Sequence, residues 1–107
     1  MKKLSNEDRF LFEEIAEDAT TDCYNEDEQI AGWACILEEN ISCPCNCLIG
    51  KEKREQAILN KIEQDKNSNS ILGIIKFGKI KIRVPIEDIT LEDSEQMSYI
   101  NAYKYWR

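Results

Sequence analysis

The chain has 107 residues, of which 42% are hydrophobic. This is enough for one domain with a modest core, and we expect that domain to span residues 1–107. Its net charge is −7, and residues 1–50 carry 12 acidic against 3 basic side chains. Such a surface repels nucleic acid and anionic membranes and attracts cations or basic partners. No apolar run reaches membrane-spanning length and the N-terminus lacks a signal-peptide core, so we expect a cytoplasmic protein.

The side chains needed for common catalytic sites are missing. There is no histidine, which removes the commonest general base and the usual partner of a nucleophilic cysteine. No phosphate-binding glycine loop or dinucleotide fingerprint occurs either. We therefore expect no enzymatic activity. The five cysteines are an odd number without an export signal, which indicates reduced thiols.

Two helices are predicted in the first 40 residues. Ser5 can cap the first, with Asp8 three residues later, and its buried side is then expected to hold Phe10, Leu11 and Ile15. In the second, Asn25 is the predicted N-cap and Glu28 completes a capping box. The helical spacing of its apolar residues predicts a buried stripe of Ile30, Trp33, Ala34 and Leu37 before a stop at Asn40.

The middle of the chain is harder to assign. Pro44 favours an extended segment over residues 43–49, in which alternate cysteines share one face. Residues 51–64 have helical propensity and a helix-like apolar pattern, although a strand edge also fits, and the pattern alone favours a helix. The polar residues 65–70 imitate the start of an EF-hand loop but lack its glycine and its closing glutamate, so we interpret them as a surface turn.

The last third begins as a β-hairpin. Two apolar runs flank Gly78-Lys79, and glycine in the first position suits a type II′ turn. We expect the second run to turn its alternate apolar side chains inward, namely Ile80, Ile82, Val84 and Ile86. Pro85 indicates an edge strand or the end of pairing.

A closing helix follows the hairpin. Asp93 or Ser94 caps this helix, and its buried stripe is expected to hold Met97, Ile100 and Tyr103. The aromatic tail over residues 103–107 is expected to pack against the rest of the chain.

The acidic residues of the second helix fall into two groups. Those in its first turn, Glu26, Asp27 and Glu28, could also bind a hard cation, but the helix dipole already stabilises them, so a site without an ion is the favoured interpretation there. At its other end Glu38, Glu39 and Asn40 oppose the dipole, so a bound cation and a plain solvated face are both open interpretations there. Oxygen ligands of this kind suit Ca²⁺.

The cysteines also leave two interpretations open. Cys43, Cys45 and Cys47, with Cys23 and Cys35, could supply thiolates to zinc or an iron–sulfur cluster. Alternate cysteines in a strand converge on a metal less readily than the usual C-x₂-C turn. Buried, reduced cysteine is the simpler interpretation.

Ordered short matches link the chain to a known family. The run from Asp22 through Asn25 to Trp33, then Leu37-Glu38, Pro44 and the Tyr105-Trp106 tail resemble the cyanobacterial calcium-binding protein family typified by CcbP. The resemblance implies an α+β fold, with N-terminal helices packed on a small antiparallel SH3-like or Sm-like barrel and a C-terminal helix. It would make residues 56–63 a strand, against the helical pattern. In this chain cysteines flank Pro44 where the family has phenylalanines.

The leading hypothesis is therefore an intracellular, non-enzymatic calcium-binding protein without an EF-hand, serving in calcium buffering or sensing. Glu38, Glu39 and Asn40 are the first choice of ligands, and Asp22 with Glu26 form a second group. One alternative is a thiolate metal or redox protein using Cys43, Cys45 and Cys47. Another is an interaction module whose acidic face meets a basic protein partner that the sequence does not identify.

Overall fold

The computed structural model describes residues 6–50, 55–65 and 67–107. In chain order, the secondary-structure elements are α1 (Asn6–Thr20), α2 (Glu26–Asn40), β1 (Cys45–Ile49), β2 (Glu55–Asp65), β3 (Ser70–Phe77), β4 (Ile80–Pro85), a 3₁₀ turn (Ile86–Asp88), β5 (Ile89–Leu91) and α3 (Ser94–Trp106). The predicted cap at Ser5 and the start of the ambiguous 51–64 segment lie outside the described residues. None of the described helices is long and apolar enough to cross a membrane.

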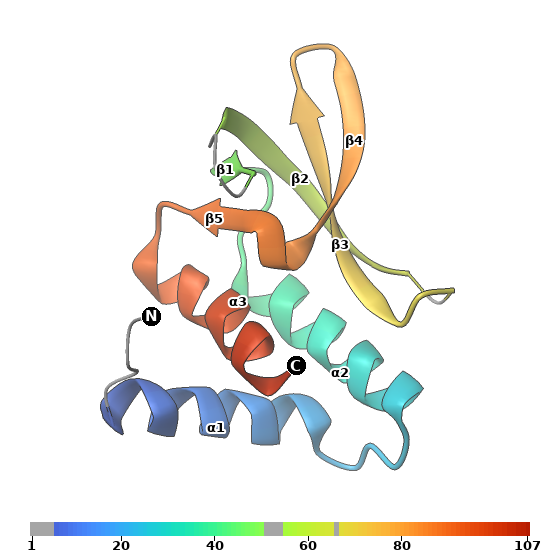
Figure 1. Cartoon of the computed structure of the whole chain (residues 1–107), viewed down its shortest axis with the longest axis vertical. Coiled ribbons are helices and arrows are strands. Elements are labelled where there is room, and N and C mark those ends of the chain that lie inside the picture. The colour runs from blue at the N-terminus through green and yellow to red at the C-terminus, as the bar shows by residue number, and fades with distance from the viewer. Residues whose placement is uncertain (1–5, 51–54, 66) are drawn as a thin grey trace.

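α2 and α3 lie on one side of an antiparallel sheet, and α1 lies beyond them, away from the sheet (Figure 1). The strand order is β4-β3-β2-β1-β5, so β4 and β5 are the edges. α2 packs against β2 and β3, α3 packs against β5 and the 3₁₀ turn, and α1 packs on both other helices. The predicted α+β class, with N-terminal helices, an antiparallel sheet and a C-terminal helix, is confirmed. Within the described residues the sheet stays open and does not close into a barrel.

The second helix matches its prediction closely. Asn25 Oδ1 accepts a hydrogen bond from the Glu28 amide at 2.9 Å, and the helix ends at Asn40. The whole predicted stripe is buried: Ile30, Trp33, Ala34 and Leu37. The capping box differs in one detail, because the Glu28 carboxylate accepts from the Tyr24 amide rather than from that of Asn25.

Residues 55–65 form a strand, so the helix favoured by the apolar pattern is wrong and the family-based strand over 56–63 is confirmed. The physical reason is a β-bulge. The pairing with β3 shifts register between Leu59 and Lys61. Leu59 and Ile62 therefore both face the core although they are three residues apart, which imitates helical spacing.

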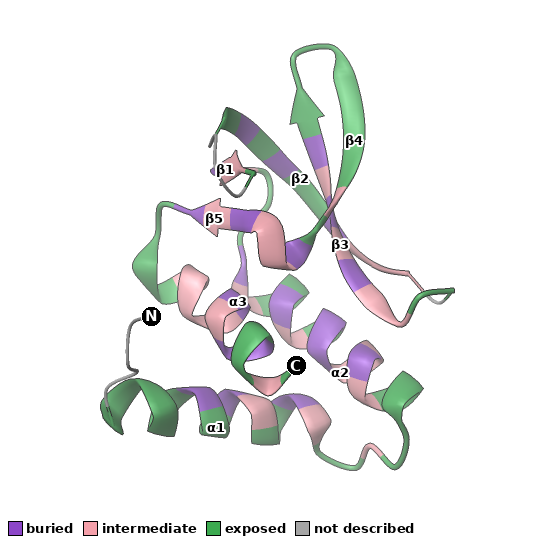
Figure 2. Cartoon of the chain, in the orientation of Figure 1, coloured by how far each residue is buried: buried purple, intermediate pink, exposed green. Residues whose placement is uncertain are grey.

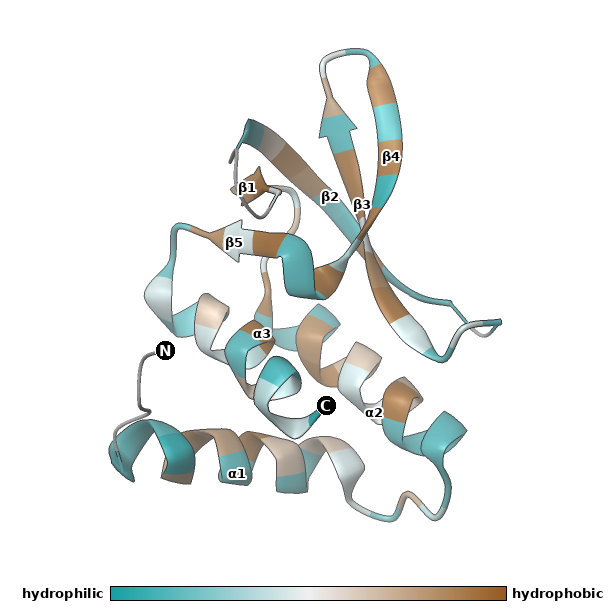
Figure 3. Ribbon diagram, in the orientation of Figure 1, coloured by the Kyte–Doolittle hydropathy of each residue, from teal (hydrophilic) through white to brown (hydrophobic). Residues whose placement is uncertain are grey.

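The β3–β4 hairpin corrects a second prediction. Gly78 has φ +63° at the turn and Phe77 pairs with Ile80, as predicted. However, Ile80 is 63% exposed and Ile82 38% exposed, and only Ile86, beyond the strand, is buried. The hairpin extends past the ends of the helices, so its apolar face is uncovered there, whereas the same face of β3 is buried lower down (Figures 2 and 3).

In α1 the buried stripe is shifted from the predicted one. Phe10 is 65% exposed and Leu11 is also exposed, while Phe12, Ile15 and Ala19 are buried. Ile15 is the only one of the three predicted residues on the core side. The buried set follows an i, i+3, i+7 spacing, which is the geometry of a single helix face.

The C-terminal helix closes the core with aromatic rings. The Asp93 carboxylate caps it by accepting from the Gln96 amide at 2.9 Å. Ile100 and Tyr103 are buried and Met97 is half-buried against them, as predicted. The centroid of the Trp106 ring lies 5.6 Å from that of the Trp33 ring, so the aromatic tail packs on the core, as predicted.

Close packing of α1 on α2 leads to a stability prediction at Gly32. A Cβ placed there would clash with the Ala19 carbonyl oxygen. Glycine to alanine within a helix ordinarily stabilises by about 1 kcal/mol. Here we expect Gly32→Ala to lower the free energy of unfolding by about 1–3 kcal/mol through overpacking. Urea denaturation followed by circular dichroism measures it, and an unchanged or higher midpoint would contradict the contact.

Candidate metal centre

The five predicted calcium ligands lie at opposite ends of one helix. Glu38, Glu39 and Asn40 form the last turn of α2, whereas Glu26 begins it. Asp22 lies in the connection from α1, with φ +59°. A helix rises 1.5 Å per residue, so about 18 Å separates Glu26 from Glu38 along the axis. The two predicted groups therefore cannot share one ion.

Within the last turn the three side chains point in different directions. Consecutive residues of an α-helix are turned by about 100°, so Glu38 and Asn40 flank the buried side of Leu37 while Glu39 faces away from it. Glu38 and Glu39 are exposed. The Asn40 amide nitrogen donates to the Ile36 carbonyl at 2.9 Å, which leaves its side-chain oxygen available as a ligand.

The electrostatics of this helix end favour a cation. The last turn contains no basic residue, and within the described part of the chain no basic side chain pairs with Glu38 or Glu39. The final carbonyl groups of a helix carry partial negative charge and lack helical partners. Carboxylate, amide and carbonyl oxygens are the ligands that hard cations take.

These donors fit Ca²⁺ in kind but do not form a closed cage. Over residues 6–50, 55–65 and 67–107 no group of three or more acidic or cysteine side chains is arranged to hold a metal ion. A calcium ion here would take one or two carboxylates, with carbonyl groups and water completing its six to eight ligands.

The structure also gathers oxygen donors that the sequence interpretation set aside. An open hollow of about 390 Å³ is lined by Asp27 and Glu28 from α2, together with Gln64 from the end of β2 and Asn69 from the β2–β3 turn. Glu28 already accepts from the Tyr24 amide. These donors come from segments that are far apart in the sequence, so no local sequence pattern could have united them.

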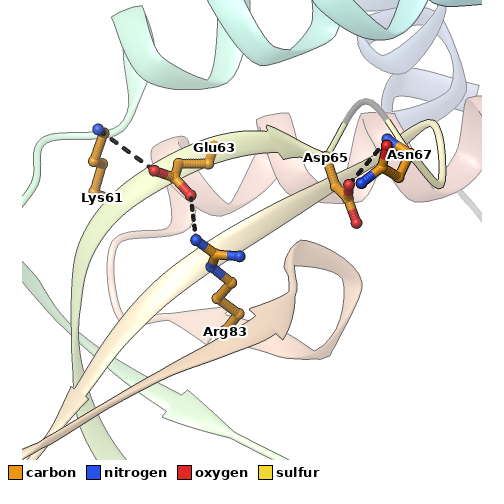
Figure 4. A network of polar contacts seen from close by, with 5 residues as sticks. All are labelled: Lys61, Glu63, Asp65, Asn67 and Arg83. Carbon is orange, nitrogen blue, oxygen red and sulfur yellow. Dashed lines mark hydrogen bonds and ion pairs between the residues drawn. The ribbon is translucent and has the colours of Figure 1, made fainter.

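The EF-hand-like stretch is a turn, as the sequence interpretation held. The Asp65 carboxylate accepts from the Ser68 hydroxyl at 2.8 Å. It also accepts from the Asn67 backbone amide at 3.0 Å (Figure 4). These hydrogen bonds, that from Ser68 foremost, lower the pKa of Asp65. Its oxygens therefore stabilise the turn. Nearby, Glu63 pairs with Lys61 at 3.6 Å and with Arg83 at 3.9 Å.

The cysteines after α2 occupy graded positions. Cys47 is buried, Cys45 is half-buried and Cys43 is exposed, and all five cysteines are free thiols. In β1, Cys45 and Cys47 face the core with Asn46 outward, as predicted, whereas Cys43 precedes the strand. Desolvation raises the pKa of Cys43 to about 11, helped by Cys45, and burial also raises the pKa of Cys47 to about 11.

The fold and this helix end define a class: a small α+β protein whose surface oxygen donors suit a hard cation. A family model described as calcium binding, that of the CcbP proteins, matches residues 13–107. The chain therefore belongs to the CcbP calcium-binding family, which confirms the resemblance of its short motifs.

Two solved structures share the fold. The crystal structure of CcbP from Anabaena matches with a TM-score of 0.78 and 15% identity, covering 99% of this chain and 94% of that one. A structure described as a calcium binding protein in the calcium-binding form matches with a TM-score of 0.75 and 13% identity, covering 96% of this chain and 94% of that one. No curated protein sequence matches the chain.

The raised thiol pKa of Cys43 predicts its labelling behaviour. Because the thiolate is the reacting species, alkylation of Cys43 by iodoacetamide should accelerate about tenfold per pH unit and continue to rise above pH 9. Peptide mass spectrometry of time points in a Cys23→Ser/Cys35→Ser background measures this rate. A plateau at or below pH 9 would show that burial and the neighbouring Cys45 do not raise the pKa of Cys43.

Proposed function

We propose that the chain is a non-enzymatic intracellular calcium buffer that binds Ca²⁺ at the C-terminal end of α2. Glu38, Glu39 and the side-chain oxygen of Asn40 are the proposed ligands, and Asp22 with Glu26 form a second, weaker group. The observation that carries the proposal is an acidic helix end with no basic residue in its last turn. Without an ion, those carboxylates oppose the helix dipole.

Membership of a calcium-binding family supports the choice of ion. The donor chemistry supports it independently, because exposed carboxylates and carbonyl groups are hard oxygen ligands. Few protein groups converge, and water must complete the shell. We therefore expect affinities at the weak end of protein calcium sites, on the order of 10⁻⁴ to 10⁻³ M.

The rigidity of the helix favours buffering over sensing. A sensor must have two arrangements that calcium distinguishes. Here the ligands proposed at the C-terminal end lie on a helix whose apolar stripe is buried in the core, including Trp33 and Leu37 at 0% exposure. Binding to an already formed helix end need not move the core.

Charge-neutral variants at the two helix ends test the ligands. We expect Glu38→Gln/Glu39→Gln to weaken calcium binding about tenfold or more, because the remaining oxygens carry no full charge. Asp22→Asn/Glu26→Gln should weaken it less. Amide shifts in NMR spectra during calcium titration measure both affinity and place, and the largest shifts should fall within residues 36–43.

Glu13→Gln/Glu14→Gln is the matched control, since it removes the same charge from the exposed face of α1. This variant should bind calcium almost as the parent does. Equal weakening in the control and the helix-end variant would indicate a diffuse ion atmosphere rather than a site. Without calcium, Glu38→Gln/Glu39→Gln should slightly raise the melting temperature, because the helix dipole is no longer opposed.

Buffering and sensing predict different spectra for the buried aromatic rings. Trp33, Tyr103 and Trp106 contact one another in the core, with ring centroids 5.4–6.2 Å apart. For a buffer, near-ultraviolet circular dichroism and tryptophan fluorescence should stay unchanged at saturating calcium. A calcium-dependent change in either signal, absent with the same concentration of Mg²⁺, would instead favour sensing.

A further inference from the structure

Exposed apolar side chains gather at two places in the described part of the chain. Three lie together at the tip of the β3–β4 hairpin, where Phe77 pairs with Ile80 and Ile82 follows on the same face of the sheet. Two more, Phe10 and Leu11, lie in the first half of α1. The hairpin tip and α1 are at opposite ends of the long axis of the molecule (Figure 1), so neither covers the other within one chain.

The hairpin tip is basic. Residues 76–83 include four basic and no acidic side chains. Arg83 is paired with Glu63, but within the described residues no acidic side chain pairs with Lys79 or Lys81. Lys79 lies in the turn and Lys81 on β4, the edge of the sheet. Both side chains are exposed and long, so their ammonium groups can meet a partner that packs on the apolar face beside them.

The outer face of α1 carries the opposite charge around its exposed apolar residue. Successive residues of a helix are turned by about 100°, so Phe10 lies nearly opposite the buried side of α1 and shares its face with three glutamates. These are Glu13, Glu14 and Glu17, and no basic side chain within the described residues pairs with them. An acidic face with an apolar centre therefore lies at one end of the molecule, and a basic tip with an apolar face lies at the other.

These charges decide which contact between two copies is favourable. Two hairpins that paired through their β4 edges would bring Lys79 and Lys81 of both chains together, and like charges across paired strands are destabilising. The acidic face of α1 instead meets the hairpin with opposite charge and covers its apolar side chains. We propose that the chain associates head to tail with a second copy of itself, with α1 of one molecule packed on the hairpin tip of the next.

This contact joins two different surfaces, so it is heterologous and leaves one unused hairpin and one unused helix in every pair. Because the two surfaces lie at opposite ends of the long axis, further copies add in a row. Few apolar side chains take part, which places the interface at the small, transient end of the range for protein contacts. The association is therefore weak, and it depends on protein concentration and on salt.

Sedimentation velocity of the reduced full chain tests the association, with a calcium chelator present so that the result is independent of the proposed calcium site. At low salt the weight-average sedimentation coefficient should rise as the protein concentration increases from micromolar to millimolar. Raising the salt from about 0.05 to about 0.5 M should weaken the association at least about threefold, because salt screens exposed charges. A monomer at every concentration would overturn the proposal.

Two variants distinguish a head-to-tail contact from a symmetric one. The hairpin variant is Ile80→Thr/Lys81→Gln and the helix variant is Phe10→Gln/Glu14→Gln. All four side chains are exposed, so both variants should keep the folded circular dichroism spectrum. Each variant alone should self-associate at least about tenfold more weakly than the parent. Mixed in equal amounts, they should form a one-to-one dimer that does not grow, because one supplies an intact helix and the other an intact hairpin.

Ile58→Thr is the matched control for the hairpin variant. Ile58 is 40% exposed, close to the 38% of Ile82, but it pairs with Lys76 on the reverse face of the sheet. This control should associate as the parent does. The head-to-tail contact would be overturned by an equal loss in the control, by a helix variant that still associates at parental strength, or by a mixture that stays monomeric.

Discussion

The packing of Trp33 is the interaction on which the rest of the structure depends. Its ring is fully buried. The ring centroid lies 5.4 Å from that of Tyr103, which it meets edge-on, and 5.6 Å from that of Trp106. Through these contacts α2 is joined to α3. The neighbouring residue, Gly32, lets the end of α1 approach because it has no side chain. All three helices are therefore positioned around one point of α2.

The energies involved explain how α2 tolerates acidic residues at both ends. Removing a buried tryptophan side chain typically costs 3–5 kcal/mol, whereas an exposed charge at the wrong end of a helix costs about 0.3–1 kcal/mol. The core contacts therefore outweigh the repulsion at Glu38 and Glu39 by several fold. The helix keeps its shape without an ion, and its end is free to present oxygen donors. The helix can be stable and still have unfavourable charges at its end, because buried residues provide the stability and exposed residues carry the charges.

The sequence predicts elements well where one local rule governs them. Asn25, Asp93 and Gly78 each act through their immediate neighbours, and each has its predicted role. Predictions fail where packing between segments that are distant in the sequence determines the structure. The bulge after Leu59 depends on the pairing of β2 with β3, and the exposure of Ile80 depends on where the helices end. The family resemblance corrected the first failure because it carries information about the whole fold.

The candidate site follows the same division. The acidic end of α2 is recognisable from sequence, because its conflict with the helix dipole is local. The hollow that unites Asp27 with Gln64 and Asn69, and the placing of Lys61 beside Cys43, both require the β2 strand to lie against α2. Gln64, Asn69 and Lys61 belong to no recognisable sequence motif that includes α2 or Cys43, so their proximity to residues of α2 and to Cys43 is seen only in the folded chain.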